Sequence, residues 1–336
     1  MDIFIINMAA APRGRPPATT SIVDANERIR IQDIRNEIWR FGELYIELNT
    51  KDNAIRWCAR HRLVKNTMPC TQCNALCTFN RHANSLDGWR WRCQACRVGV
   101  TVRKNSFFSR SHLTLQEIVI IIYCWAHDTP QLTLMHETQI SKHTAIDWSN
   151  FMREECDNWL QRNASELGGL DANGQQIVVE IDESKYFHRK YDRGTWREGH
   201  WVFGGIERES GKCFMVVVQD RAAATLEQLI EEHILPGTHI MSDGWRGYRN
   251  VSLLRNGVYD HSVVIHERYF VDPIDRENHT QNCENMWMRA KRKLKRQFGT
   301  SDALFPSYLQ EFVYRSYYTG QDLFANFLAT LFENYI

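Results

Sequence analysis

Two short apolar runs in this chain each end in an aspartate. The first spans 176–182 and ends in Asp182, and the second spans 238–243 and ends in Asp243, with a glycine directly after it. Short runs rich in β-branched and apolar residues are typical of buried strands, so each predicts a strand that delivers an acid to the edge of a sheet. A third acid, Glu284, opens a predicted helix. Three convergent carboxylates suit divalent cations of the Mg²⁺ type, which prefer oxygen ligands.

A pair of such ions predicts phosphoryl transfer. Two cations about 3.5–4 Å apart stabilise the attacking and the leaving oxygen of an in-line displacement at phosphorus. We therefore predict two Mg²⁺ ions, or Mn²⁺, held by Asp182, Asp243 and Glu284. Glu183 is also acidic, but neighbouring residues of a strand point to opposite faces, so we expect its side chain to lie away from this site.

The elements predicted after residue 174 explain how the two aspartates meet. They comprise a meander of three strands, a helix and two further strands, at 176–182, 200–206, 212–218, 225–233, 239–243 and 262–266. This order matches the ribonuclease H-like α/β fold, in which the first and fourth strands are neighbours. The sequence therefore predicts a mixed sheet with Asp182 and Asp243 side by side.

A second cluster of chemically active residues lies upstream. Cys70 and Cys73 form one Cys-x₂-Cys pair, nineteen residues separate it from the next, and Cys93 and Cys96 form the second. This spacing is typical of a zinc ribbon, in which four thiolates complete a tetrahedron around one Zn²⁺. Because four thiolates leave no open position, the predicted ion is structural. Cys77 is a spare cysteine in the same region.

Basic residues are concentrated in two blocks, although the formal net charge is only +1. Residues 54–112 contain eleven Lys and Arg against one acid, and residues 285–296 contain six against none. Such blocks in a neutral chain predict contacts with nucleic acid, with a solvated surface as the alternative for the first block. The residues that we expect to contact DNA are Arg90 and Arg92 between the cysteine pairs, and Arg292 and Lys295 on the helix of Glu284.

Residues 1–25 have the composition of a disordered tail. Arg13 and Arg15 lie in a Pro-Arg-Gly-Arg-Pro segment, which predicts an AT-hook that enters A·T-rich minor grooves or, alternatively, a plain basic linker. The ten cysteines do not indicate disulfides, because no signal peptide is recognisable at the N-terminus and the longest apolar run, 118–125, is too short for a membrane span. We expect a soluble, reduced, intracellular protein.

The helical middle of the chain allows two interpretations. A short helix at 131–137 and a longer one from Ser141, its expected N-cap, to about 160 suggest a helix-turn-helix, with Lys142 and His143 at the exposed start of the longer helix. A plain helical bundle explains the pattern equally well. The predicted domains are a tail, a helical segment, the zinc ribbon, the helical region and the catalytic domain, at 1–25, 26–66, 67–110, 111–166 and 175–336.

Several separated motifs resemble those of one family. From residue 55 to about 330 the chain is similar to the DDE transposases of the Merlin superfamily and their bacterial insertion-sequence relatives. The motifs are 139–141, 179–184, 189–191, 201–204, 207–208, 242–245 with Tyr248, 270–273, and 279–280 with Glu284 and Trp287. This resemblance implies a ribonuclease H-like core, Mg²⁺ dependence and cut-and-paste transposition at terminal inverted repeats. It also implies double-stranded DNA as the partner, no membrane, and a homodimer or larger synaptic assembly.

The resemblance assigns Asp182, Asp243 and Glu284 as metal ligands and Lys291, seven residues after Glu284, as the basic residue that follows the third acid. Some relatives carry Asn just after the His-Thr pair, where this chain has Gln281 and then Asn282. These amides stay open as alternatives, although a carboxylate binds Mg²⁺ better.

Other residues near these motifs have open roles. Arg189 and Lys190 are expected to reach DNA, with solvated loop charges as the alternative. His279 either contacts the scissile phosphate or caps the following helix. The alternative functions are a metal-dependent nuclease or resolvase of the same fold and a domesticated DNA-binding protein. The expected location is the nucleus in a eukaryotic host, or the cytoplasm and nucleoid in a bacterium.

Overall fold

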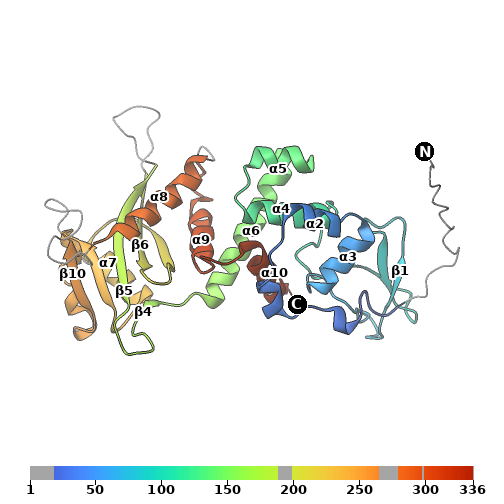
Figure 1. The fold of residues 1–336 in the computed structure, drawn as a ribbon, viewed down its shortest axis with the longest axis horizontal. Helices are drawn as coiled ribbons and strands as arrows, with labels where there is room; N and C mark the ends of the chain where they lie inside the picture. The colour runs from blue at the N-terminus through green and yellow to red at the C-terminus, as the bar shows by residue number, and fades with distance from the viewer. Residues whose placement is uncertain (1–18, 188–198, 265–278, 297–298, 336) are drawn as a thin grey trace, which may run out of the picture. The chain divides into compact units, whose positions relative to one another are not determined.

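The computed structural model describes residues 19–187, 199–264, 279–296 and 299–335 (Figure 1). The chain divides into two compact units, one made of Met1–Tyr123 with Leu331–Ile336 and the other of Cys124–Thr330. The division falls inside two helices, α4 (Leu115–Ala126) and α10 (Leu323–Tyr335). The AT-hook arginines Arg13 and Arg15 lie outside the described residues.

Short helices and one small sheet make up most of the first unit. The elements are η1 (Ala25–Glu27), α1 (Ile31–Arg35), α2 (Phe41–Glu47), α3 (Lys51–Arg60), β1 (Thr78–Arg81), β2 (Trp89–Arg92) and β3 (Gly99–Thr101). The three strands form an antiparallel sheet in sequence order. In β2, Trp91 is buried and Arg92 is exposed, as expected for a strand with alternating side chains. This sheet holds the chain between the two cysteine pairs.

Three helices of the second unit form a packed layer. They are α5 (Gln131–Thr138), α6 (Lys142–Asn163) and α9 (Phe305–Ser316). Ser141 caps α6 as predicted, because its hydroxyl oxygen accepts the backbone N–H of Thr144 at 3.1 Å. The apolar stripe of α6 packs on α9, where Trp159 and Tyr314 meet with ring centroids 5.3 Å apart. The start of α6 is exposed, as a DNA-binding role would require. A DNA-binding role for α5 and α6 stays a prediction.

A five-stranded mixed sheet carries the two aspartates. Its elements are β5 (Val178–Tyr186), β6 (His200–Glu207), β7 (Cys213–Val218), α7 (Ala223–His233), β9 (His239–Asp243) and β10 (Asp260–Val264). The strand order is β10-β9-β5-β6-β7, with β6 antiparallel to β5 and β7, and with β9 parallel to β5 and β10. The first and fourth of these strands are therefore neighbours. This confirms the predicted ribonuclease H-like fold.

Smaller elements complete this unit. They are the paired strands β4 (Leu167–Gly168) and β8 (Ile234–Leu235), the turns η2 (Arg246–Tyr248) and η3 (Val251–Asn256), and the helix α8 (Gln281–Arg296). The predicted last strand, 262–266, is found two residues earlier as β10, and its final two positions lie outside the described residues.

Asp182 lies in the middle of β5 and not at its end, which differs from the prediction. The reason is that the two neighbours of β5 have different lengths. The antiparallel ladder with β6 continues to Tyr186, whereas β9 pairs only with Val178–Glu180 and ends at Asp243. Beyond Glu180 no strand in the described ranges pairs with the edge of β5 that faces β9, and both aspartates lie where the two strands separate.

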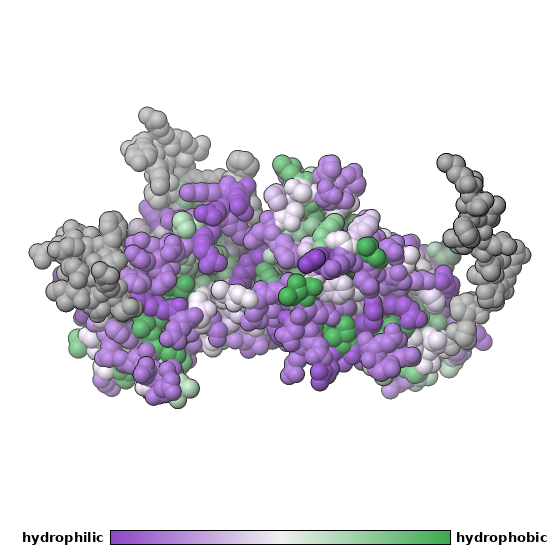
Figure 2. Space-filling model, in the orientation of Figure 1, coloured by the Kyte–Doolittle hydropathy of each residue, from purple (hydrophilic) through white to green (hydrophobic). Residues whose placement is uncertain are grey.

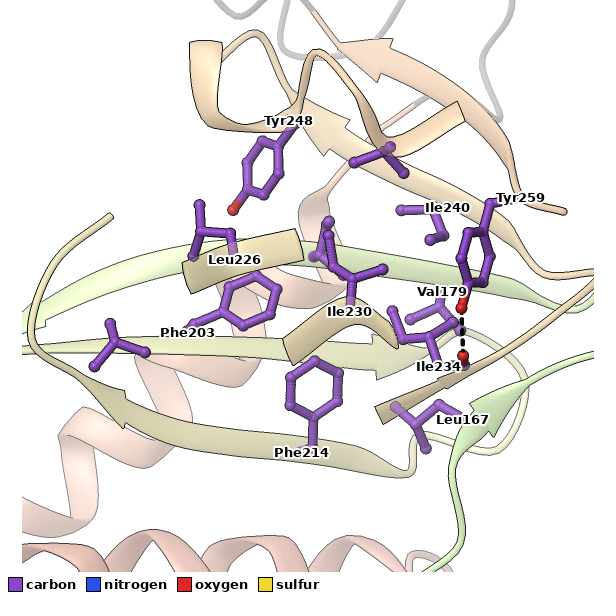
Figure 3. Packing of buried hydrophobic residues seen from close by; sticks show 13 residues of the cluster. Leu167, Val179, Phe203, Phe214, Leu226, Ile230, Ile234, Ile240, Tyr248 and Tyr259 are labelled. Atoms are coloured by element: carbon purple, nitrogen blue, oxygen red, sulfur yellow. Dashed lines mark hydrogen bonds between the residues drawn. The ribbon is translucent and has the colours of Figure 1, made fainter. Parts of the chain in front are cut away.

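The two faces of the sheet are covered by different helices. On one face, Leu226 and Ile230 of α7 pack on Val179 and Phe203, in a cluster that is buried throughout (Figure 3). On the other face, α8 packs on β5 and β6 through its buried residues, among them Cys283 and Trp287. Because strand residues alternate, one set of β5 side chains builds the core under α7 and the other set faces α8.

The face of the molecule in Figure 2 is mostly hydrophilic, and its hydrophobic residues gather only in small patches. None of the helices in the described ranges is long and apolar enough to cross a membrane.

Candidate active site and metal centre

Asp182 and Asp243 form the centre of the candidate active site. The indole N–H of Trp287 donates to Oδ2 of Asp182 at 3.1 Å, and the backbone N–H of Trp245 donates to Oδ1 of Asp243 at 2.9 Å. Burial, followed by the negative charges of Glu183 and Asp243, raises the pKa of Asp182 to about 7. Within the described residues, neither aspartate makes an ion pair with a basic side chain. Among the described residues, the two aspartates therefore have no cation that compensates their charge.

A glycine on the neighbouring strand makes room for this arrangement. Gly204 is the register partner of Asp182 on β6. A Cβ atom at this position would lie 2.8 Å from Cη2 of Trp287 and 2.8 Å from the carbonyl oxygen of Phe214. Without a side chain here, the indole lies directly on the sheet, and its N–H reaches the carboxylate.

Helix α8 presents Glu284 and Lys291 on one flank. The two residues are seven positions apart, which is close to two helical turns, and Trp287 lies between them on the buried side. The Lys291 ammonium donates to the hydroxyl of Ser184 and lies 5.0 Å from the ring centroid of Tyr186. Ser184 and Tyr186 lie two and four residues after Asp182 on β5, so the three side chains share one face of the strand. Lys291 lies over that face.

Glu284 is exposed and less closely placed than the two aspartates. Among the described residues, the only group of three or more potential metal ligands whose ligand atoms all lie within 4.8 Å of one another is a set of four cysteines. The three acids are thus not drawn together to that distance. The assignment of Glu284 as third ligand stays a prediction, as do the alternatives Gln281 and Asn282, which lie in the same first turn of α8.

A buried ion pair that sequence reasoning missed fixes the start of α8. Glu180 is fully buried, and its carboxylate accepts from Nε of Arg208 at 2.7 Å and from the backbone N–H of Cys283 at 2.9 Å. The side-chain amide of Asn282 donates to the same carboxylate at 2.8 Å. Arg208 also donates to the carbonyl oxygen of His279 at 2.7 Å. We call Glu180 and Arg208 the α8 clamp.

A signal for the clamp was present in the sequence. Glu180 interrupts an apolar strand two residues before Asp182, so it shares a face with that aspartate, and a buried charge there requires a partner. The structure also places His279 beside the clamp, with Nδ1 3.4 Å from the backbone N–H of Gln281. This position agrees with the capping role that was one of its two predicted roles.

Glu183 points to the face opposite Asp182, as expected. The hydroxyl of Tyr248 donates to its carboxylate, and Nη1 of Arg221 lies 3.8 Å from Oε1. Burial raises the pKa of Glu183, although the hydrogen bond from Tyr248 acts in the other direction.

The four cysteines of the two Cys-x₂-Cys pairs gather as predicted. The ligand atoms of Cys70, Cys73, Cys93 and Cys96 all lie within 4.8 Å of one another. The Sγ atoms of Cys73 and Cys93 are 3.6 Å apart, close to the separation of about 3.8 Å expected for two thiolates that lie about 2.3 Å from one Zn²⁺. This donor set fits a closed, structural zinc site, and the unit is consistent with a zinc ribbon.

Backbone donors in the cysteine turns favour thiolates. The N–H of Gln72 donates to Sγ of Cys70 at 3.4 Å, and the N–H of Cys96 donates to Sγ of Cys93 at 3.3 Å. Hydrogen bonds from the backbone of Cys73 and Gln72 lower the pKa of Cys70 to about 7. Burial and the neighbouring sulfurs instead raise the pKa of Cys77, so this fifth cysteine behaves as a buried thiol.

The residues predicted to contact DNA are found in different settings. Arg92, Lys142, His143, Arg292 and Lys295 are exposed, whereas Arg90 is half-buried and donates to the carbonyl oxygen of Gly99 at 3.0 Å. Arg189, Lys190 and the 270–273 motif lie outside the described residues. No contact in the structure tests these DNA assignments, and they stay predictions.

Comparison with known proteins adds independent support. Residues 170–316 match the model of the ISXO2-like transposase domain. A transposase-like protein of Haemophilus influenzae is 29% identical over 104 residues, which cover 31% of this chain and 80% of that protein. These matches support a transposase. The segment that matches the transposase domain contains β5, β9 and α8.

Solved structures of viral integrases are similar only at a low level. The catalytic core domain of BIV integrase aligns with a TM-score of 0.29 and 14% identity, over 41% of this chain and 81% of that chain. The HTLV-2 integrase catalytic core domain in complex with magnesium aligns with a TM-score of 0.26 and 13% identity, over 43% and 83%. The fold assignment rests on the strand order described above.

Proposed function

We propose that this chain is a DDE transposase that cleaves DNA strands at the terminal inverted repeats of its element and joins the ends to target DNA. The observation that carries the proposal is the pair Asp182 and Asp243, side by side where β5 and β9 separate, with a charge that no described basic residue neutralises. The match to a transposase domain over residues 170–316 supports it. The motifs shared with the Merlin superfamily favour that group.

The acids would hold two Mg²⁺ ions. Asp182, Asp243 and Glu284 are the proposed ligands, and the bound ions would activate a water or a DNA 3′-hydroxyl and stabilise the leaving oxygen. Asp182 has to lose its proton to bind an ion, because its pKa is raised to about 7. The hydrogen bonds from Trp287 and Trp245 use one lone pair of each accepting oxygen, so both carboxylates keep free lone pairs in a fixed orientation.

Helix α8 would bring the third acid and a phosphate contact to the same place. Its first turn is held by the α8 clamp, which ties Cys283 to the residue two positions before Asp182 on β5. Glu284 is the next residue along the helix, and Lys291 lies over Ser184. We propose that the Lys291 ammonium, which donates to Ser184, also contacts the phosphate that follows the scissile bond, as a point charge on a flexible stem.

The other parts of the chain would bind DNA. We propose that the zinc ribbon and the α5–α6 region hold the transposon end through Arg90, Arg92, Lys142 and His143, and that Arg292 and Lys295 contact the strand near the acids. Because two ends have to be cut together, we propose a dimer or a larger synaptic assembly. The proposed location is the nucleus in a eukaryotic host, or the cytoplasm and nucleoid in a bacterium.

A strand-transfer assay tests the proposal. Zinc-loaded protein is mixed with a pre-cut end of the parent element and a plasmid target, with Mg²⁺ in one reaction and Ca²⁺ in another. We expect joined product with Mg²⁺ alone, and a loss of about 1000-fold in Asp243→Asn, because each metal ion contributes several kcal/mol of transition-state stabilisation. The exposed residue Asp260 on β10 supplies the matched control, Asp260→Asn.

Other results would replace the proposal. Cleavage without joining would indicate a nuclease or resolvase of the same fold. Binding to the end with neither reaction, at concentrations where the complex is saturated, would indicate a domesticated DNA-binding protein.

A further inference from the structure

A basic pocket lies close to Asp243 and is not part of the proposed metal site. It has a volume of about 540 Å³ and is lined by Arg221, Trp245, Arg246 and Arg249 together with the first residues of α7. We call it the arginine pocket. Its walls come from the segment before α7 and from η2, the turn that follows Asp243. Three arginines at one pocket, with no acid among the described residues that line it, favour an anionic ligand.

One of the three arginines is held rigidly. The guanidinium carbon of Arg221 lies 4.0 Å from the ring centroid of Trp201 and 4.3 Å from that of Trp245, so two indoles enclose it. The indole N–H of Trp245 also donates to the carbonyl oxygen of Arg221 at 3.4 Å. An arginine held by two aromatic rings loses little entropy when it binds a phosphate, because its orientation is already set.

The other two arginines are accessible. Arg246 and Arg249 are exposed on or directly after η2, and Arg246 lies 5.5 Å from the ring centroid of Trp245. The described residues place neither of them in an ion pair with an acid. Asp220, the acid that directly precedes Arg221 in the sequence, accepts at Oδ1 from the backbone N–H of Ala222 and from the hydroxyl of Thr225.

The position of the pocket relates it to the acids. Trp245 is a wall of the pocket, and its backbone N–H donates to Asp243 at 2.9 Å. Arg221 lies 3.8 Å from Glu183, whose side chain points to the face of β5 opposite Asp182, so the pocket lies on the α7 face of the sheet. An anion in the pocket would thus lie near the end of β9 that carries Asp243, and a polyanion of regular spacing could extend from the pocket to the acids. DNA is such a polyanion, and arginines bind its phosphates without reading base sequence.

We propose that the arginine pocket binds a backbone phosphate of duplex DNA and positions a strand at Asp182 and Asp243. The inference rests on the proposed function only in taking DNA as the ligand. The pocket could serve the transposon end or the target, which share this chemistry, and a binding experiment without catalysis can separate the two.

The test compares the double variant Arg246→Ala/Arg249→Ala with the wild-type chain. Binding of labelled duplexes is followed by fluorescence anisotropy without Mg²⁺ over a range of salt concentrations, with the element's end in one series and a random sequence in the other. Loss of two phosphate contacts should lower the slope of log K against log salt by about 1–2. We expect affinity near 100 mM salt to fall on the order of 10-fold for at least one duplex.

Two controls make the result specific. The variant Arg162→Ala/Arg255→Ala removes the same charge from exposed residues of the same unit that do not line the pocket. Thermal unfolding should show that both variants are folded, because all four side chains are exposed. A loss on the end duplex alone assigns the pocket to the transposon end, and a loss on the random duplex assigns it to sequence-independent binding such as target capture.

The inference fails if the pocket variant binds both duplexes like the wild type, or if the control variant loses as much affinity. These outcomes are distinct from a failure of the proposed function. If the wild-type chain joins no strands but the pocket variant loses DNA affinity, the arginine pocket is supported and the transposase proposal is rejected. If the wild-type chain joins strands and the pocket variant binds and joins DNA normally, the transposase proposal is supported and the arginine pocket is rejected.

Discussion

Two carboxylates in the unit Cys124–Thr330, the buried Glu311 and the partly buried Asp182, meet opposite electrostatic surroundings. Glu311 of α9 is 1% exposed and is paired with Nζ of Lys293 at 2.5 Å and with Nη2 of Arg315 at 2.9 Å. Burial acts to raise its pKa, but the two cations outweigh burial and lower the pKa to about 2. Asp182 of β5 meets two further acids in place of cations, and its pKa is raised to about 7.

The difference shows which acid serves the fold and which serves a ligand. A buried charge is costly unless it is paired, and this chain pairs Glu311 from two sides. No basic side chain in the described part of the chain pairs with Asp182, which lies next to Asp243. Uncompensated acids of this kind cluster at functional sites, where a ligand supplies the missing positive charge. Removing the charge of Glu311 should therefore destabilise the fold, and removing the charge of Asp182 should stabilise it.

The largest effect on stability is expected at the α8 clamp. Like Glu311, its buried Glu180 is paired with a cation, but the clamp lies beside Asp182. Arg208→Ala leaves the fully buried Glu180 without its cation, and we expect a loss of about 3–5 kcal/mol in the free energy of unfolding. Because the clamp holds the start of α8, amide hydrogen exchange at Cys283 should also become faster. Arg208→Lys keeps the charge and should recover part of the stability. Equal losses in both variants would mean that packing, and not charge, holds α8.

A somewhat smaller loss is expected at Glu311. Glu311→Gln keeps the shape and removes the charge that pairs Lys293 and Arg315, and those two side chains are 20% and 15% exposed. We expect the free energy of unfolding at pH 7 to fall by about 2–3 kcal/mol, measured by denaturant titration. The exposed Glu232→Gln is the matched control.

The pH dependence of Glu311 has a definite sign. Its pKa in the folded chain, about 2, is below the ordinary value of 4.5, so the stability that it contributes is present above pH 4.5 and is lost as the pH falls toward 2. The deficit of Glu311→Gln should therefore shrink in acid. A deficit that is constant with pH would contradict the ion-pair account.

The smallest effect has the opposite sign. The pKa of Asp182 in the folded chain, about 7, is above the ordinary value of 3.8, so its ionisation destabilises the metal-free fold as the pH rises from about 4 to 7. Asp182→Asn removes this penalty. We expect the variant to unfold at a temperature a few degrees above the wild type at pH 8, with no gain near pH 4. A variant that is less stable at pH 8 would show that the acid is needed by the fold.

Local patterns carried much of the sequence prediction. The strands and the two cysteine pairs are each recognisable in short runs of residues, and the adjacency of Asp182 and Asp243 follows from the fold that the order of elements predicts. The extension of β5 beyond Asp182 was missed, because strand length is set by the neighbour β6 and not by the strand's own sequence.

Contacts between distant residues account for the other omissions. Arg208 is 28 positions from Glu180, and Asn282 is 102 positions from it, so periodicity gave no sign that they share one carboxylate. The enclosure of Arg221 by Trp201 and Trp245 is equally long-range. The part of the site that depends on such contacts could be found only in three dimensions.

The most direct test of the central claim is a Mn²⁺ titration of the zinc-loaded chain, followed by electron paramagnetic resonance at pH 6 and pH 8. If Asp182 and Asp243 bind divalent cations, Mn²⁺ should bind more tightly at pH 8 than at pH 6, because Asp182 must lose a proton. Binding should be lost in Asp182→Asn and retained in folded Glu311→Gln. Mn²⁺ binding that is unchanged by Asp182→Asn, or that does not depend on pH between 6 and 8, would contradict the account.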